Sequence, residues 1–208
     1  MPGAIPAQRR PLGSITVVFG PMFANKTTTL LAELKEAVSK GRKVMAFKPK
    51  IDDRYHPINI VAHSKDSYPA IVVTEAKQIL DAVLAEEILP DDVFLEEIEF
   101  IEDSRDDRGK DGVLTLDQVV VILKVHGCYV HCYGLNRKHD GTPFIVTACV
   151  MAVGDTLREL KADCDGKCHR PNSATYSRRL DKSKGDIKIG NGKDYCANCD
   201  DCYFEDKR

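Results

Sequence analysis

The residues with the clearest chemical meaning form a loop near the amino terminus, Gly20-Pro-Met-Phe-Ala-Asn-Lys26-Thr27. Its spacing fits the phosphate-binding pattern G-x-x-x-x-G-K-[ST] except at the second glycine. In such loops the first N–H groups of the following helix, together with its dipole, attract an anion. Lys26 would bring a positive charge to the β- and γ-phosphates, and the Thr27 hydroxyl would ligate Mg²⁺. We therefore expect these residues to bind a triphosphate with Mg²⁺: Gly20, Pro21, Met22, Phe23, Ala24, Asn25, Lys26, Thr27 and Thr28.

Asn25 stands where the pattern has its second glycine. After glycine, asparagine is the residue that best tolerates a left-handed backbone, so we expect the loop conformation to survive. The alternative is an ordinary strand–helix turn in which Lys26 and Thr27 have no chemical role. The strand predicted before the loop and the helix predicted after it favour phosphate binding.

Two adjacent carboxylates, Glu96 and Glu97, lie at the carboxyl end of a predicted strand that starts at Asp92. Open α/β sheets bind their ligands at this end of the strands. Phosphoryl transfer needs a carboxylate near Mg²⁺, and usually a second one that positions or deprotonates the acceptor. A solvated acidic strand end is the alternative, and it would be the better interpretation without the phosphate-binding loop. With the loop, the pair predicts a catalytic site.

A second candidate site lies in the cysteine-rich tail. Cys199 and Cys202 are separated by two residues, as in a zinc knuckle, and Cys164 and Cys168 are separated by three. Four thiolates suit a tetrahedral structural Zn²⁺ with no open position for catalysis. Surface thiols without a metal are the alternative.

Other metal-ligating residues lie close to these pairs. His169 adjoins Cys168 and could replace it, and Cys196 precedes the second pair.

Two further cysteines, Cys128 and Cys132, are distant from the tail in sequence and lie in an apolar segment, where a thiol is usually an inert part of the core. We expect core packing for these two thiols and a single zinc site in the tail.

The elements that must position the loop are clear from the apolar pattern. Ser14–Phe19 is a β-branched run suited to a buried strand, and Lys26–Lys40 has apolar residues at helical spacing. Lys43–Lys48 predicts a second strand. A strand–loop–helix–strand unit of this kind feeds a parallel sheet with helices on its faces.

The rest of the chain continues this alternation. Further predicted elements are a strand at Ile71–Val73, a helix at Thr74–Glu87, a helix at Leu114–Val125, a strand at Cys128–Tyr133 and the end of a helix at Asp155–Lys161. We predict a disordered leader over 1–13, an α/β domain over 14–160 with a charged, mobile insertion at 102–112, and a zinc-binding lobe over 161–208. The fold class is α/β, a parallel sheet flanked by helices as in P-loop NTPases.

Composition limits the classes of partner. The 208 residues carry a net charge of −2, which gives no electrostatic case for binding nucleic acid. No apolar run approaches the ~20 residues of a membrane span. The amino-terminal residues have no apolar region of a secretory signal, so we expect a cytoplasmic protein with reduced cysteines.

Several motifs in the same order resemble the cellular type of thymidine kinase, a zinc-bearing family. The family's motifs are GPMFSGKT, KPxxDxRY, IDEAQFF, GLDxDFxGxPF and IGGxxxYxxxCRxCY. The corresponding segments here start at Gly20, Lys48, Leu95, Gly134 and Ile189. The resemblance covers nearly everything from Ser14 to Phe204 apart from the charged insertion.

The resemblance implies an ATP- and Mg²⁺-dependent kinase that phosphorylates thymidine in nucleotide salvage for DNA synthesis, and a homotetramer. Lys26 and Thr27 would bind the triphosphate and Mg²⁺, and Glu96 would be the Mg²⁺-linked carboxylate. Glu97 would be the general base that takes the proton from the nucleoside 5′-hydroxyl. Both cysteine pairs would hold the zinc of a lasso that covers the nucleoside. The implied nucleoside-binding residues are Met22, Asp52, Arg54, Phe100, Leu135, His139, Phe144, Ile187, Ile189 and Tyr195.

The departures from the family lie within its working motifs. Besides Asn25, Glu96 replaces an aspartate, Glu99 a glutamine and His139 a phenylalanine of the nucleoside pocket. A divergent viral or phage enzyme is one interpretation. A catalytically impaired nucleotide-binding or assembly protein on the same fold is the alternative.

Overall fold

The computed structural model describes residues 10–51, 57–101, 113–180 and 194–205. Its centre is a six-stranded sheet in the order β5-β2-β6-β7-β1-β8, in which all neighbouring strands are parallel. In chain order these strands are β1 (Ser14–Phe19), β2 (Val44–Pro49), β5 (Ile71–Val73), β6 (Asp92–Leu95), β7 (Tyr129–Gly134) and β8 (Thr156–Glu159).

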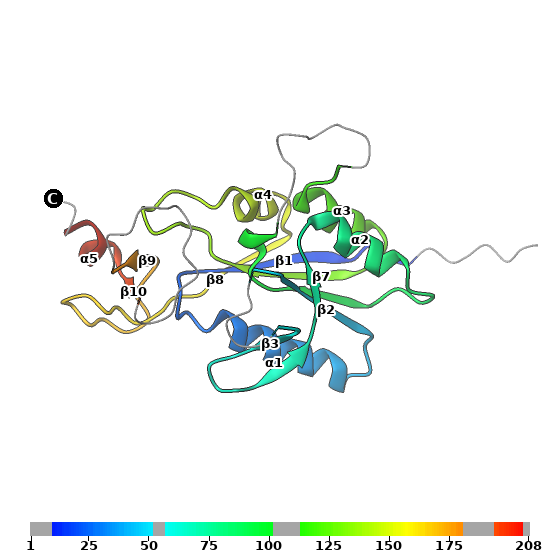
Figure 1. Cartoon of the computed structure of the whole chain (residues 1–208), viewed down its shortest axis with the longest axis horizontal. Helices are drawn as coiled ribbons and strands as arrows, with labels where there is room; N and C mark the ends of the chain where they lie inside the picture. Colours follow the sequence, from blue (N-terminus) through cyan, green and yellow to red (C-terminus); the bar gives the residue numbers. More distant parts are fainter. Residues whose placement is uncertain (1–9, 52–56, 102–112, 181–193, 206–208) are drawn as a thin grey trace, which may run out of the picture.

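Helices cover both faces of this sheet (Figure 1). Helix α1 (Lys26–Ser39) lies on one face, and α2 (Ala76–Leu84), α3 (Leu116–Val125) and α4 (Ile145–Val153) lie on the other. The position of strand β1 between these layers explains why its sequence is almost continuously apolar. Ile15 and Val17 belong to the core cluster beneath α2, α3 and α4, whereas Val18 packs with the leucines of α1. A strand buried on both faces has no polar side.

Smaller elements complete the chain. The hairpin of β3 (Asn59–Val61) and β4 (Ser67–Pro69) lies near α1, and the short 3₁₀ helix η1 (Ile98–Phe100) follows β6. The carboxyl-terminal lobe consists of antiparallel β9 (Tyr176–Arg179) and β10 (Tyr195–Asn198), followed by α5 (Asp200–Glu205), and projects from one end of the domain in Figure 1. Among the described residues, no helix has the length and apolar character needed to cross a membrane.

The structure confirms most of the predicted elements. Strands Ser14–Phe19 and Ile71–Val73 have the predicted bounds, and the other strands and the helices before α4 differ by a few residues at their ends. The helix predicted to end within Asp155–Lys161 is wrong. That segment forms β8, which pairs with β1 from Thr16↔Thr156 to Phe19↔Glu159, while α4 ends before it. Backbone pairing with the sheet edge therefore determines the conformation of this segment.

The predicted boundaries of the first segment need adjustment. Arg10, placed in the predicted leader, donates hydrogen bonds to the carbonyls of Leu89 and Pro90 and forms an ion pair with Asp91. The N–H of Gly13 donates to Lys124 O at 2.9 Å. The chain is therefore part of the domain from Arg10 onward. The charged insertion predicted at 102–112 lies outside the described residues.

Candidate active site and metal centre

The loop between β1 and α1 folds around the side chain of Lys26. Its ammonium donates to the carbonyl oxygens of Gly20 at 3.2 Å and Pro21 at 2.8 Å, and the side chain is buried. Gly20 is required because a Cβ there would lie 2.0 Å from Leu160 O. The loop thus holds its cation near the helix start, where backbone N–H groups and the helix dipole attract anions.

Asn25 has the left-handed backbone that the sequence predicts. Its φ of 57° and ψ of 27° place it at the amino-terminal cap of α1. Its carbonyl accepts the first helical hydrogen bonds, including one from Thr29 N at 2.9 Å. The conformation that glycine adopts easily is therefore retained with asparagine.

Thr27 and Glu96 meet at the end of the sheet. The Thr27 hydroxyl donates to Glu96 Oε1 at 2.9 Å, and the Glu96 side chain is buried. Glu96 follows β6, and its N–H donates to Phe47 O in β2 at 3.0 Å, which fixes its position. The Thr27 hydroxyl and the Glu96 carboxylate supply hard oxygen ligands of the kind that Mg²⁺ prefers, and Lys26 lies next to Thr27 in the chain. The residues present therefore fit a magnesium ion bound with a triphosphate.

Glu97 begins a sharp turn into η1. It has a left-handed backbone, with φ of 47° and ψ of 48°, and its side chain is partly exposed. This turn separates it from the buried Glu96 while keeping both carboxylates at the same end of the sheet. Glu99, two residues later, is buried, and burial raises its pKa well above the ordinary value.

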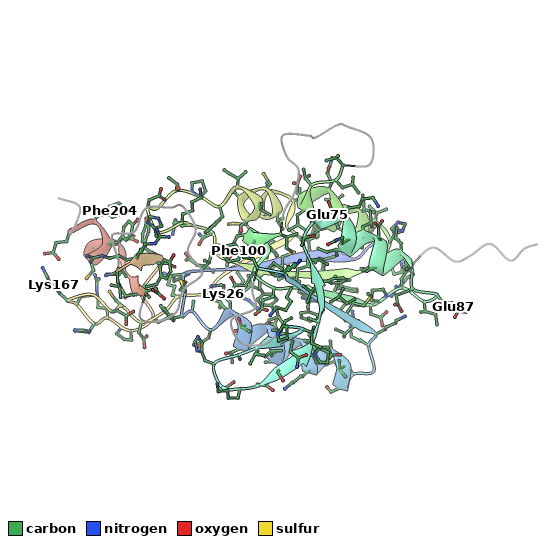
Figure 2. The ribbon with its side chains drawn as sticks, viewed as in Figure 1. Lys26, Glu75, Glu87, Phe100, Lys167 and Phe204 are labelled. Carbon is green, nitrogen blue, oxygen red and sulfur yellow. The ribbon has the colours of Figure 1, made fainter. Side chains whose placement is uncertain are left out.

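Phe100 and Phe144 are brought together, although they are far apart in sequence. Their rings meet edge to face with centroids 6.0 Å apart. Phe144 caps the start of α4, where its N–H donates to Asn136 O at 3.1 Å. Leu135 is partly buried directly after β7. In the view of Figure 2, Phe100 lies toward the same part of the domain as Lys26.

Two further predicted nucleoside-binding residues lie in or against the carboxyl-terminal lobe. The His139 carbonyl accepts a hydrogen bond from the Tyr203 hydroxyl at 2.8 Å. Tyr195 is buried in β10, and the Arg179 guanidinium donates to its hydroxyl at 3.2 Å. Four of the ten, Asp52, Arg54, Ile187 and Ile189, lie outside the described residues, so the structure does not place them.

Ser177 is a site residue that the sequence analysis does not single out. Its hydroxyl accepts a hydrogen bond from the N–H of Met22 at 2.8 Å, and the side chain is buried. It lies in β9, in a segment rich in lysine and arginine. No local pattern distinguishes this serine, because its partner is 155 positions away.

The four predicted zinc ligands form one cluster. The sulfur atoms of Cys164, Cys168, Cys199 and Cys202 all lie within 4.8 Å of one another. His169 and Cys196 are not members of this cluster. The thiolate set has the number and type of ligands for a closed, tetrahedral structural zinc.

The surroundings of the cluster also suit a metal bound by thiolates. Gly166 allows the close approach of Cys202, because a Cβ at Gly166 would lie 2.7 Å from the Cys202 sulfur. Arg170 donates to the sulfurs of Cys168 at 3.4 Å and Cys199 at 3.2 Å. The hydrogen bond from Arg170 lowers the pKa of the Cys168 thiol to about 6, which favours the thiolate form.

Comparison of the sequence with known protein families gives a match over a range that contains the phosphate loop, the carboxylates and the four cysteines. The family model described as thymidine kinase matches residues 13–203. The chain belongs to the thymidine kinase family. Its six-stranded parallel sheet, flanking helices and cysteine lobe confirm the predicted fold class. Membership of the thymidine kinase family supports nucleoside phosphorylation as the general activity.

Among solved structures, the chain is similar to AMPPCP-bound DnaA from Aquifex aeolicus. The identity is 14%, the TM-score is 0.39, and the match covers 76% of this chain and 43% of that one. A likeness at this level carries no functional argument.

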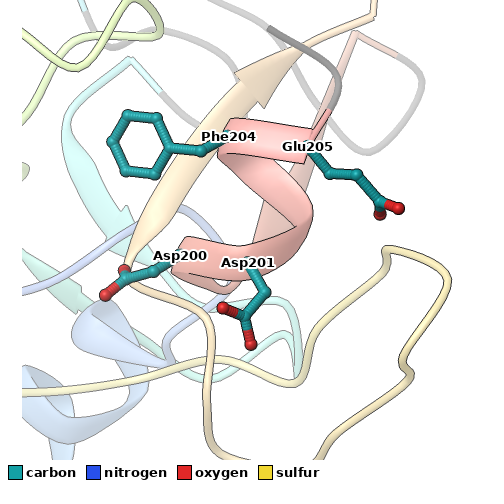
Figure 3. A pocket seen from close by; sticks show the side chains of 4 residues that line it. All are labelled: Asp200, Asp201, Phe204 and Glu205. Carbon is teal, nitrogen blue, oxygen red and sulfur yellow. The ribbon is translucent and has the colours of Figure 1, made fainter. Parts of the chain in front are cut away.

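A separate open hollow of about 460 Å³ lies on the lobe (Figure 3). It is lined by Asp200, Asp201, Phe204 and Glu205 from α5. Its carboxylates would repel a triphosphate, and Figure 2 places Phe204 far from Lys26. This hollow is therefore not a candidate phosphate site.

Proposed function

We propose that the protein transfers the γ-phosphoryl group of ATP to the 5′-hydroxyl of thymidine. The observation that carries the proposal is the contact of Thr27 with Glu96, next to Lys26 on one side and Glu97 on the other. Phosphoryl transfer needs a cation at the phosphates, a metal-linked carboxylate and a group that accepts the acceptor's proton. All three types of group lie at one end of this sheet.

Lys26 and the N–H groups at the start of α1 would bind the β- and γ-phosphates. In the structure the Lys26 ammonium interacts with carbonyls of its own loop, which phosphate oxygens of opposite charge would replace as partners. Thr27 and Glu96 would hold Mg²⁺. Bound there, the ion would neutralise charge on the phosphates and align them for transfer.

Glu97 would orient the 5′-hydroxyl and accept its proton as the new oxygen–phosphorus bond forms. The proton passes from the hydroxyl to the carboxylate, while the bond between the γ-phosphorus and the bridging oxygen of ATP breaks. The partly exposed position of Glu97 at the turn into η1 gives a substrate hydroxyl access to it.

Phe100, Phe144, Leu135 and Met22 would enclose the base and the deoxyribose. Tyr195 would contribute from the lobe. Asp52, Arg54, Ile187 and Ile189, which lie outside the described residues, stay predicted contacts. Zinc on the four cysteines would fold the lobe, because a structural zinc stabilises a small domain directly. The predictions of a homotetramer, a cytoplasmic location and a salvage role for DNA synthesis rest on the family resemblance.

A direct test is conversion of thymidine with ATP and Mg²⁺, followed by chromatography of the products. We expect thymidine monophosphate from the wild type and none above background without Mg²⁺. A panel of the other deoxynucleosides under the same conditions would identify the preferred base. Tight binding of ATP without any turnover on this panel would instead support the catalytically impaired protein, for which the Asn25 and Glu99 departures are the motivation.

A further inference from the structure

Glu99 is a buried carboxyl group that the proposed mechanism does not use. Only 6% of the residue is exposed, and among the described residues no N–H or O–H group of another residue donates to either carboxyl oxygen, whereas the side chain of Glu97 lies within hydrogen-bonding reach. One oxygen is also tightly confined, because a Cβ at Gly134 would lie 2.5 Å from Glu99 Oε2. A buried carboxylate without donors is costly, so this group needs a physical explanation.

Two charged side chains act on this carboxyl in opposite directions. Burial is the main cause of its raised pKa, the negative charge of Glu97 raises it further, and the ammonium of Lys26 lowers it. Among the described residues, the elements packed most extensively against η1 are α4, β7 and β2. Helix α4 has no charged residue, and β7 meets the carboxyl at Gly134. Lys48 of β2 directs its ammonium to Asn59 O at 3.1 Å.

Two neighbouring carboxylates cannot easily both be ionised when one of them is buried. When one holds a proton, its hydroxyl can donate to the other, and the repulsion becomes a hydrogen bond. Glu97 is partly exposed, whereas Glu99 is buried, so desolvation places the proton on Glu99. The lysine that opposes this arrangement is the one expected to bind phosphates, which would reduce its effect on Glu99 when nucleotide is present.

We propose that Glu99 is a positioning residue that keeps a proton and donates a hydrogen bond to the Glu97 carboxylate, which fixes the orientation of that carboxylate. The assigned role of Glu97 rests on the proposed function, but the proton on Glu99 does not. A protonated glutamate has the shape and donor capacity of glutamine, which stands at this position in the family motif IDEAQFF.

The first test compares the wild type with Glu99→Gln by denaturant unfolding across pH 4 to 9. An unfolded glutamate releases its proton near pH ~4.3, while the folded group with the raised pKa retains it. The stability that this group contributes is full below ~4.3 and is lost as pH rises toward the folded pKa. The unfolding constant of the wild type should therefore rise relative to that of Glu99→Gln by up to about tenfold per pH unit above ~4.3. A ratio that stays constant over this range would overturn the proposal.

The second test detects the proton directly by infrared spectroscopy. At neutral pH the wild type should show the C=O stretch of a protonated carboxyl group that Glu99→Gln lacks. In Glu97→Gln, the loss of the neighbouring negative charge should lower the pH at which this band disappears. Identical bands in the wild type and Glu99→Gln would contradict the proposal. Neither test needs catalytic turnover, so an inactive protein would refute the proposed function without affecting the outcome for Glu99.

A third readout applies if the protein is an active kinase. Glu99→Gln should retain turnover at neutral pH and also at alkaline pH. The wild type should lose turnover at alkaline pH, because Glu99 loses there the proton that it donates to Glu97. Glu99→Ala should lower kcat by about 10- to 100-fold, because the base loses its fixed orientation. Equal alkaline decline in the wild type and Glu99→Gln, with no loss in Glu99→Ala, would exclude a positioning role.

Discussion

The Ser177 hydroxyl in β9 accepts a hydrogen bond from the backbone N–H of Met22 in the phosphate loop, at 2.8 Å. This contact joins two parts of the chain that the sequence predicts separately, the loop at β1 and the cysteine lobe. Strand β9 pairs with β10, which leads to Cys199, so the metal cluster is connected to the phosphate loop through one small sheet.

Ser177→Ala should remove the hydrogen bond that joins the carboxyl-terminal lobe to the phosphate loop. The Met22 N–H would lose its acceptor in a buried place, at a cost of about 1–3 kcal/mol in the free energy of unfolding. We also expect a higher KM for thymidine, because Met22 is a proposed contact of the nucleoside. Denaturant unfolding and steady-state kinetics would measure both effects. Ser39→Ala, at an exposed helix end, is the matched control; equal behaviour of the two variants would show that the contact is unimportant.

Asn25 gives a prediction about the backbone of the loop. Because its φ is 57°, Asn25→Gly should fold at least as well and retain nucleotide binding. Asn25→Val should destabilise the protein by about 1–2 kcal/mol, since a β-branched residue resists the left-handed region. Thermal unfolding with and without ATP would compare the variants. If Asn25→Gly restored a high activity that the wild type lacked, asparagine would be the cause of catalytic impairment.

The cysteine cluster predicts one zinc ion per chain. Metal analysis by mass spectrometry should give this ratio for the wild type and for Cys196→Ser, and a much lower ratio for Cys202→Ser. Gly166→Ala leaves all four thiols in place but puts a methyl group against Cys202, so it should also weaken zinc retention against a chelator. Loss of zinc from Cys196→Ser with retention in Cys202→Ser would contradict the assigned ligand set.

Removal of zinc should also affect the distant phosphate loop. The lobe would lose the metal that folds it, and with it the fixed position of Ser177 against Met22. Chelation should therefore raise the KM for thymidine and lower the melting temperature, and added Zn²⁺ should reverse both. Unchanged kinetics in fully zinc-free protein would show that the lobe is not part of the nucleoside site.

The parts of this fold that the sequence predicts are those with a local pattern. The run Ser14–Phe19 is apolar because both of its faces are buried, and the spacing of four cysteines is enough to define the cluster. Strand β8 has no such pattern, because three of its four residues are exposed. The conformation of β8 comes from its backbone pairing with β1, and its side chains alone do not predict this pairing.

The same distinction applies to the site. Lys26, Thr27 and the Glu96–Glu97 pair follow from motifs, since each lies next to a strand end. The Tyr203–His139 and Ser177–Met22 contacts join residues 64 and 155 positions apart and leave no local pattern. The burial of Glu99 is similar: within an acidic segment it resembles a solvated carboxylate, and only packing against Gly134 shows otherwise.

The central claim is that Glu97 is the base of a thymidine-phosphorylating site. The most direct measurement is the rate of thymidine monophosphate formation by the wild type and by Glu97→Gln, with ATP and Mg²⁺ at saturating thymidine. Because general base catalysis contributes about 10²- to 10⁴-fold, kcat should fall by at least about 100-fold while ATP binding is retained. Equal rates in the two proteins, or no product from either, would contradict the claim.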